Sequence, residues 1–137
     1  MEQSLKLIIQ QNAEEIRRLH RRIHTALRTR DRSPEEYEAW KAACAEFHQR
    51  YDALAFPGGY TGALDRILSG DVNSIEAALC FVETRPFFFR SGYMYKDLLR
   101  KLKHAPIDAA NAKRLESILQ AYAEYRRQRR QRTSTEK

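Results

Sequence analysis

The stretch Ser33-Pro34-Glu35-Glu36 divides the N-terminal half of the chain into two helical segments and decides how that half folds. The Ser33 hydroxyl can accept a hydrogen bond from a free amide of a first helical turn, and Pro34 has a backbone φ suited to that turn. Glu36 follows Ser33 by three residues, the spacing at which a carboxylate reaches back to the capping residue. The stretch therefore predicts the start of a second helix shortly after the end of the first.

Apolar side chains recur at spacings of three and four residues on both sides of this stretch, as in amphipathic helices. The first helix, about residues 3–30, carries Leu5, Ile9, Ile16, Leu19, Ile23 and Leu27. The second carries Tyr37, Trp40, Cys44, Phe47, Tyr51 and Leu54. Because the link between them is short, we expect a long antiparallel hairpin over residues 1–56. Arginines of the first helix would then pair with acidic residues of the second, namely Glu36, Glu38 and Glu46.

Four further helices are predicted after Phe56-Pro57-Gly58-Gly59, which ends the second helix. They cover about residues 61–69, then 74–84 starting at Asn73, then 91–104, and finally a segment capped by Asp108. We expect one all-α domain over residues 1–125. In it, two shorter helix pairs (61–125) follow the hairpin as a bundle or as a stack similar to an α-solenoid. Residues 126–137 are predicted to be a basic, flexible tail.

Positive charge is concentrated in separate blocks of the 137-residue chain, whose net charge is +7. Residues 84–137 carry 14 Lys and Arg against 5 Asp and Glu, and residues 17–32 carry seven arginines against one aspartate. Such blocks attract nucleic acid or acidic proteins, or are neutralised within the fold. We predict no leader segment, because the first residues lack a basic region followed by an apolar run, and no membrane span, because no apolar run is long enough. Cys44 and Cys80 do not suggest a disulfide framework. We expect a cytoplasmic protein without membrane contact.

Motifs of catalysis are absent from the sequence. It contains no phosphate-binding glycine loop, no nucleophile elbow and no HExxH pair. The acidic clusters Glu14-Glu15 and Glu35-Glu36-Glu38 fit helix starts and solvent-facing positions, not a buried acid–base pair. We therefore predict no enzymatic activity and no cofactor.

Two pairs of side chains have a spacing that suits metal ligands. His20 and His24 are four residues apart on the first helix, and Cys44 and His48 are four apart on the second. In an antiparallel hairpin these pairs would lie level with each other. However, the surrounding arginines would repel a dication, and a thiol within an aromatic stripe usually acts as a small apolar side chain. We therefore predict that no metal is bound there.

The connector between the fourth and fifth predicted helices is the most unusual segment, because Phe87-Phe88-Phe89 lies between Arg85 and Arg90. Three consecutive aromatic residues in a connector cannot all point the same way. Most rings of this kind fill a core. An exposed ring beside arginines would instead form a protein-binding hot spot or a platform for base stacking.

The preferred functional hypothesis is a non-catalytic helical module that binds another protein, in particular an acidic one. Its predicted contact residues are Phe88, Arg90, Tyr93, Lys96 and Arg100. The alternative is a sequence-tolerant RNA or DNA binder. For that function the predicted contacts are Lys101, Lys103, Arg126, Arg127, Arg129 and Arg130. Self-association through an open apolar face of the first helix is a third hypothesis.

Overall fold

The computed structural model describes the backbone of residues 2–135 and the side chains of residues 2–132. Within residues 2–135 it contains helices and no strands, so the predicted all-α fold is confirmed. The helices are α1 (Glu2–Thr29), α2 (Pro34–Ala55), α3 (Ala63–Leu68), α4 (Val72–Thr84), α5 (Ser91–His104) and α6 (Ala109–Thr135). No helix in this part of the chain combines the length and the apolar character that a membrane span requires.

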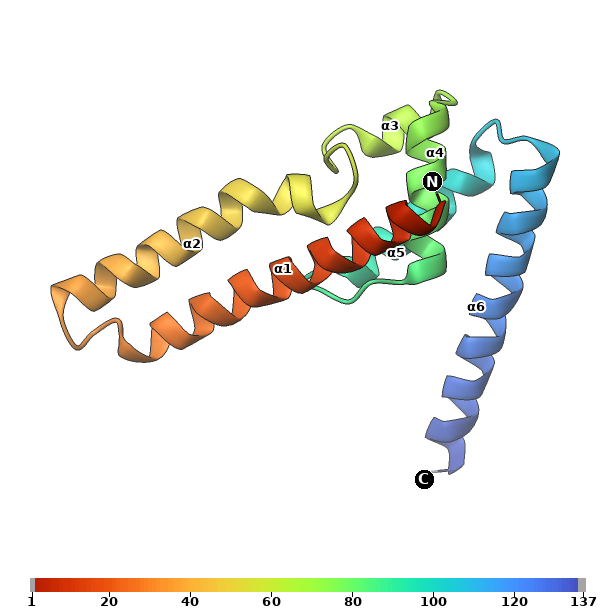
Figure 1. Ribbon diagram of the computed structural model, residues 1–137. Helices are drawn as coiled ribbons and strands as arrows, with labels where there is room; N and C mark the ends of the chain where they lie inside the picture. Colours follow the sequence, from red (N-terminus) through yellow and green to blue (C-terminus); the bar gives the residue numbers. More distant parts are fainter. Residues whose placement is uncertain (1, 136–137) are drawn as a thin grey trace.

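Helices α1 and α2 form the predicted antiparallel hairpin, which extends away from the other helices (Figure 1). The Ser33 hydroxyl accepts a hydrogen bond from the Glu36 amide at 3.1 Å, as the capping pattern predicts. Arg22 of α1 pairs with Glu46 of α2. Glu38, another of the predicted partners, instead pairs with Lys41 of its own helix.

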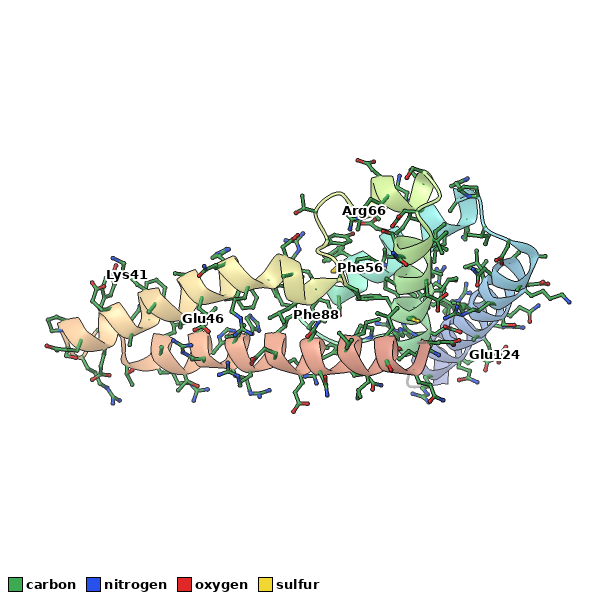
Figure 2. All side chains as sticks on the ribbon, turned by 45° about the horizontal axis from the view of Figure 1, so that its top comes forward. Lys41, Glu46, Phe56, Arg66, Phe88 and Glu124 are labelled. Atoms are coloured by element: carbon green, nitrogen blue, oxygen red, sulfur yellow. The ribbon has the colours of Figure 1, made fainter. Side chains whose placement is uncertain are left out.

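A chain of aromatic rings joins the hairpin to the remaining helices. The buried ring of Phe88 lies 6.1 Å from that of Tyr51 on α2 and 6.1 Å from that of Phe81 on α4, measured between ring centres. Phe81 in turn lies 6.2 Å from Phe56, the residue at which α2 ends. Figure 2 labels Phe56 and Phe88 at this junction, with Lys41 toward the far end of the hairpin. The junction is thus an apolar core that fixes the connector between α4 and α5.

Helix α4 is at the centre of the second half of the molecule. It contacts α1, α3, α5 and α6, and every residue from Ala77 to Val82 is buried. This arrangement is a bundle rather than a solenoid, because in a solenoid each unit contacts only its neighbours. The helix begins earlier than predicted. Asp71, not Asn73, is the cap, and its carboxylate accepts a hydrogen bond from the Ser74 amide at 3.0 Å.

Helix α6 corrects the prediction of a tail after residue 125. Asp108 caps it as expected, accepting from the Asn111 amide at 2.8 Å, but the helix then continues to Thr135. Arginine and glutamine are good helix formers, and Glu124 pairs with Arg127 one turn later, and both effects favour helix in this segment. Residues 136 and 137 of the predicted tail lie outside the described residues.

Candidate functional site

A wide groove of about 1740 Å³ lies on the described surface. It is bounded by α1, by the connector of residues 85–90, by α5 and by the second half of α6. Among the described side chains, no Asp or Glu lines it. The basic side chains that line it are Arg17, Arg21, Arg85, Arg90, Lys96, Arg100, Lys103, Arg126, Arg129 and Arg130. Three basic blocks that are far apart in the sequence therefore meet in one groove.

The two sets of predicted contact residues meet in this same groove. From the protein-binding set, Arg90, Tyr93, Lys96 and Arg100 line it. From the nucleic-acid set, Lys103, Arg126, Arg129 and Arg130 line it. Two members of the second set do not. Lys101 is outside the lining, and so is Arg127, which pairs with Glu124 at 2.7 Å.

Phe88, the fifth member of the protein-binding set, also borders the groove. The residue is only 5% exposed, however, so its ring is not presented to a partner as predicted. The reason is the junction described above, where the ring packs between Tyr51 and Phe81. Its neighbours are the exposed ones, Phe87 at 78% and Phe89 at 47%.

Each of the three phenylalanines of the connector forms a hydrogen bond through its backbone. Arg17 of α1 donates to the Phe87 carbonyl at 2.5 Å, and the Tyr51 hydroxyl donates to the Phe89 carbonyl at 2.7 Å. The Phe88 amide donates to the Ser91 hydroxyl at 3.0 Å. These contacts come from both helices of the hairpin and from the start of α5. The backbone of the connector is therefore held by contacts from three elements.

Arg85 ties the connector to α6 by stacking among tyrosines. Its guanidinium carbon lies 4.9 Å from the ring centre of Tyr95 on α5, and 5.5 and 4.1 Å from those of Tyr122 and Tyr125 on α6. Cation–π contacts of this kind are strongest for arginine over electron-rich rings. Burial raises the pKa of the Tyr95 phenol, so the ring remains neutral. Arg85 thus forms one wall of the groove.

Several cations of the groove have no acidic partner within the described side chains. Neither Arg21, Lys96, Lys103 nor Arg130 forms an ion pair with a carboxylate of residues 2–132. Arg100 is different, because it pairs with Asp97 at 2.6 Å. These four charges are therefore not compensated by a described carboxylate, in contrast to Arg22 and Arg50, which pair with Glu46 inside the hairpin.

The candidate metal ligands take part in ring packing instead. The His20 ring lies 5.6 Å from the Phe47 ring and 5.1 Å from the Phe89 ring, and it meets the His24 ring edge-on at 4.6 Å. Burial and the neighbouring His24 lower the pKa of His20. No group of three or more His, Cys, Asp or Glu in the described residues is arranged to hold a metal ion, and this includes Cys44 and His48.

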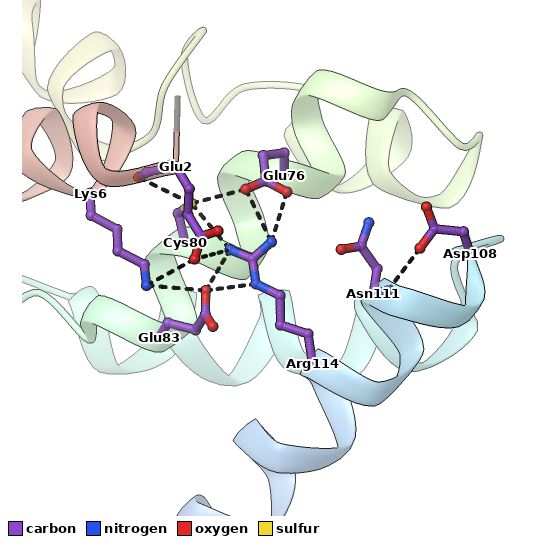
Figure 3. Close-up of polar contacts among 8 residues, drawn as sticks. All are labelled: Glu2, Lys6, Glu76, Cys80, Glu83, Asp108, Asn111 and Arg114. Carbon is purple, nitrogen blue, oxygen red and sulfur yellow. Dashed lines mark hydrogen bonds and ion pairs between the residues drawn. The ribbon is translucent and has the colours of Figure 1, made fainter.

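A second polar cluster, which sequence analysis missed, attaches α6 to the core and so positions the groove wall (Figure 3). Arg114 of α6 binds Glu76 at 2.8 Å and Glu83 at 2.5 Å, both on α4, and Glu2 of α1 at 3.4 Å. Burial by itself would lower the pKa of Arg114, but the hydrogen bonds to Glu83 and Glu76 raise it above its usual value. Burial raises the pKa of the adjoining Cys80 thiol to about 11. The thiol is therefore protonated at neutral pH.

No protein-family model, curated protein or solved structure matches this chain. Its function is therefore inferred from the groove itself. The lining combines guanidinium and ammonium groups, which bind anions, with exposed aromatic rings, which stack on flat partners. Sequence reasoning identified seven of the ten basic lining residues but missed Arg17 and Arg21, whose positive charges were expected to be neutralised by acidic residues of α2. It also missed Arg85, whose left-handed backbone (φ 51°) has no local sequence signal.

Proposed function

We propose that this chain binds nucleic acid through the groove and catalyses no reaction. One observation carries the proposal: ten basic side chains from α1, the connector, α5 and α6 line one groove, and no described carboxylate lines it. A nucleic-acid backbone carries a negative charge at every phosphate, and neutralising several of them releases condensed counterions. A continuous cationic groove is the surface that this mode of binding requires.

An acidic protein, the partner that the sequence alone favoured, is the second candidate. The exposed ring of Phe87 beside the arginines supports it, since such rings form binding hot spots. However, charged residues as a class are depleted in the cores of protein–protein interfaces, although arginine by itself is enriched there. Interfaces with nucleic acid are far more positively charged. The composition of the groove therefore favours nucleic acid.

The test is a binding titration with matched charge reversals. A labelled oligonucleotide of about 20 nucleotides, longer than typical single-strand sites, is titrated at low salt and followed by fluorescence anisotropy. The double variant Lys96→Glu/Lys103→Glu places two acids in the groove. The control Lys101→Glu/Lys113→Glu makes the same change in net charge outside the lining.

We expect the groove variant to lose at least tenfold in affinity, and the control to lose about threefold or less, because only the former places like charge beside the bound phosphates. Equal losses in both variants would contradict the proposal, as would the absence of binding by the wild type. If polyglutamate binds in a groove-dependent way and the oligonucleotide does not, the partner of the groove is an acidic protein and not nucleic acid.

A further inference from the structure

We infer that the groove takes a single nucleic-acid strand, not a duplex, and that unpaired bases stack on the exposed rings of Phe87 and Tyr93. The inference rests on the proposed function and adds the class of nucleic acid. The first supporting observation is the exposure of two aromatic residues. Phe87 is 78% and Tyr93 is 68% exposed, and both line the cationic groove. Isolated exposed rings are common on protein surfaces, so exposure needs support from a second observation.

That second observation is the fixed backbone that carries the Phe87 side chain. Arg17 of α1 binds the Phe87 carbonyl, and the buried Phe88 anchors the next position of the chain in the core. A backbone that is already held in place loses little conformational freedom when a partner binds, and affinity improves for that reason. A phenylalanine that merely protruded by chance would not need a backbone fixed at this position.

A third observation is the backbone conformation at the two ends of the connector. Arg85 and Arg90 have φ values of 51° and 69°, and they are the non-glycine residues with positive φ in the described chain. A large side chain in this left-handed region is uncommon, and such outliers concentrate at binding and active sites. Here the two residues enclose the connector, so the strain lies at the segment that carries the exposed phenylalanines.

Charge and rings alternate around these positions. The Arg90 guanidinium carbon lies 5.3 Å from the Tyr93 ring centre, and Lys96 follows on the exposed face of α5. A base on Tyr93 would therefore have cations close to its phosphates. In a duplex, each base is already stacked on both faces and presents only its edges. In a single strand the faces are free, and interleaved rings and cations are the usual surface for binding it.

The experiment compares three labelled probes of equal length with the wild type and with ring variants. The probes are a single strand, the corresponding duplex, and a strand whose bases are replaced by abasic sites. The abasic strand keeps its phosphates and cannot stack. Phe87→Ala/Tyr93→Ala removes both rings, and Phe87→Trp/Tyr93→Trp keeps two aromatic faces. Both positions are exposed, and unchanged circular dichroism and melting temperature confirm that each variant is folded.

We expect the wild type to bind the single strand at least tenfold more tightly than the abasic strand or the duplex, because only the single strand offers free base faces to the two aromatic rings. The alanine variant should lose this preference while its affinity for the abasic strand is unchanged. The tryptophan variant should keep the preference, and its indole emission should be quenched by the single strand but not by the abasic one.

The result that overturns the inference is separate from the one that overturns the proposed function. Equal affinity of the wild type for all three probes, with continued loss of binding in Lys96→Glu/Lys103→Glu, would show a groove for nucleic acid without stacking. Tighter binding of the duplex would also reject the single strand. Failure of every probe to bind at low salt would reject nucleic acid altogether.

Discussion

Phe87 and Phe88 are neighbours in the chain but have opposite environments. The Phe88 ring packs between Tyr51 and Phe81, whereas the Phe87 ring is largely in solvent. Phe88→Ala should lower the free energy of unfolding by about 3–5 kcal/mol, the usual cost of a large cavity in an aromatic core. Phe87→Ala should change it by about 0.5 kcal/mol or less, as for other surface positions. Urea titrations of the two variants measure both values.

Equal destabilisation by the two substitutions would mean that the connector is not anchored through Phe88. Phe88→Leu is a useful intermediate, because it fills part of the cavity and should cost less than Phe88→Ala. The comparison also explains why a variant that removes Phe88 cannot report on the binding surface. Any loss of binding in it would reflect loss of the folded junction.

His20 should make stability depend on pH near neutrality. Burial and the adjacent His24 lower its pKa below the usual 6.5, so the folded state favours the neutral ring. Its contribution to the free energy of unfolding is complete above pH 6.5 and is lost as the pH falls through the lowered pKa. The neighbouring carboxylates Glu15 and Glu46 have lowered pKa values through arginine hydrogen bonds, chiefly Arg18 and Arg22 respectively, and stay ionised in this window.

The measurement is urea unfolding at several pH values between about 5.5 and 7.5, for the wild type and His20→Phe. The phenylalanine keeps a ring between Phe47 and Phe89 but cannot titrate. We expect a smaller loss of stability on acidification in the variant. The same pH dependence in both proteins would show that His20 does not contribute.

Features that depend on nearby residues, such as helix caps, could be predicted from the sequence. Features that depend on tertiary packing, such as the burial of one phenylalanine of the connector, could not. Ser33 and Asp108 were predicted as caps because a cap depends on residues three positions away. Which of the three consecutive phenylalanines is buried depends on the left-handed turns at Arg85 and Arg90, which interrupt the periodicity of both flanking helices. Because the helical periodicity does not continue through the connector, the sequence pattern could not show that Phe88 belongs to the core.

At the scale of elements, the attachment of α6 depends on Arg114. Its side chain is 17% exposed and binds Glu76 and Glu83 of α4. Arg114→Met should destabilise the fold by about 2 kcal/mol, since it leaves two partly buried carboxylates without their cation. Arg127→Met removes the exposed pair with Glu124 and should cost about 0.5 kcal/mol or less. Thermal unfolding of both variants distinguishes the two kinds of ion pair, and equal costs would contradict the role given to Arg114.

The helices themselves were largely predictable, because periodicity and capping fix them locally. The end of α6 was not. Every described side chain after Tyr122 is exposed, so the apolar pattern stops there although the helix continues to Thr135. Intrinsic propensity and the Glu124–Arg127 pair maintain it. The segment predicted to be a basic flexible tail is therefore helical as far as Thr135 and contributes Arg126, Arg129 and Arg130 to the groove lining.

At the scale of the whole molecule, the groove exists only because α1, the connector, α5 and α6 come together. The composition shows an excess of positive charge, but from the sequence we expected the arginines of α1 to pair with acidic residues of α2 and not to line a groove. The structure assigns Arg22 to Glu46 and leaves Arg17 and Arg21 in the groove lining. That division follows from the direction of each side chain around one helix. It could not be known before α4–α6 were placed against α1.

A groove that binds through phosphates must release counterions, and this predicts the salt dependence of binding. For a single strand the logarithm of the association constant falls with the logarithm of salt concentration by about 0.7 per phosphate neutralised, so contact with about six phosphates gives a slope near −4. Lys96→Ala/Lys103→Ala should make the slope shallower by about 1.4, because two contacts are lost. The control Lys101→Ala/Lys113→Ala, outside the lining, should leave the slope unchanged.

Anisotropy titrations over a salt series measure all three slopes. A wild-type slope near zero would mean that the cations of the groove do not contact phosphates, because apolar binding does not weaken steeply with salt.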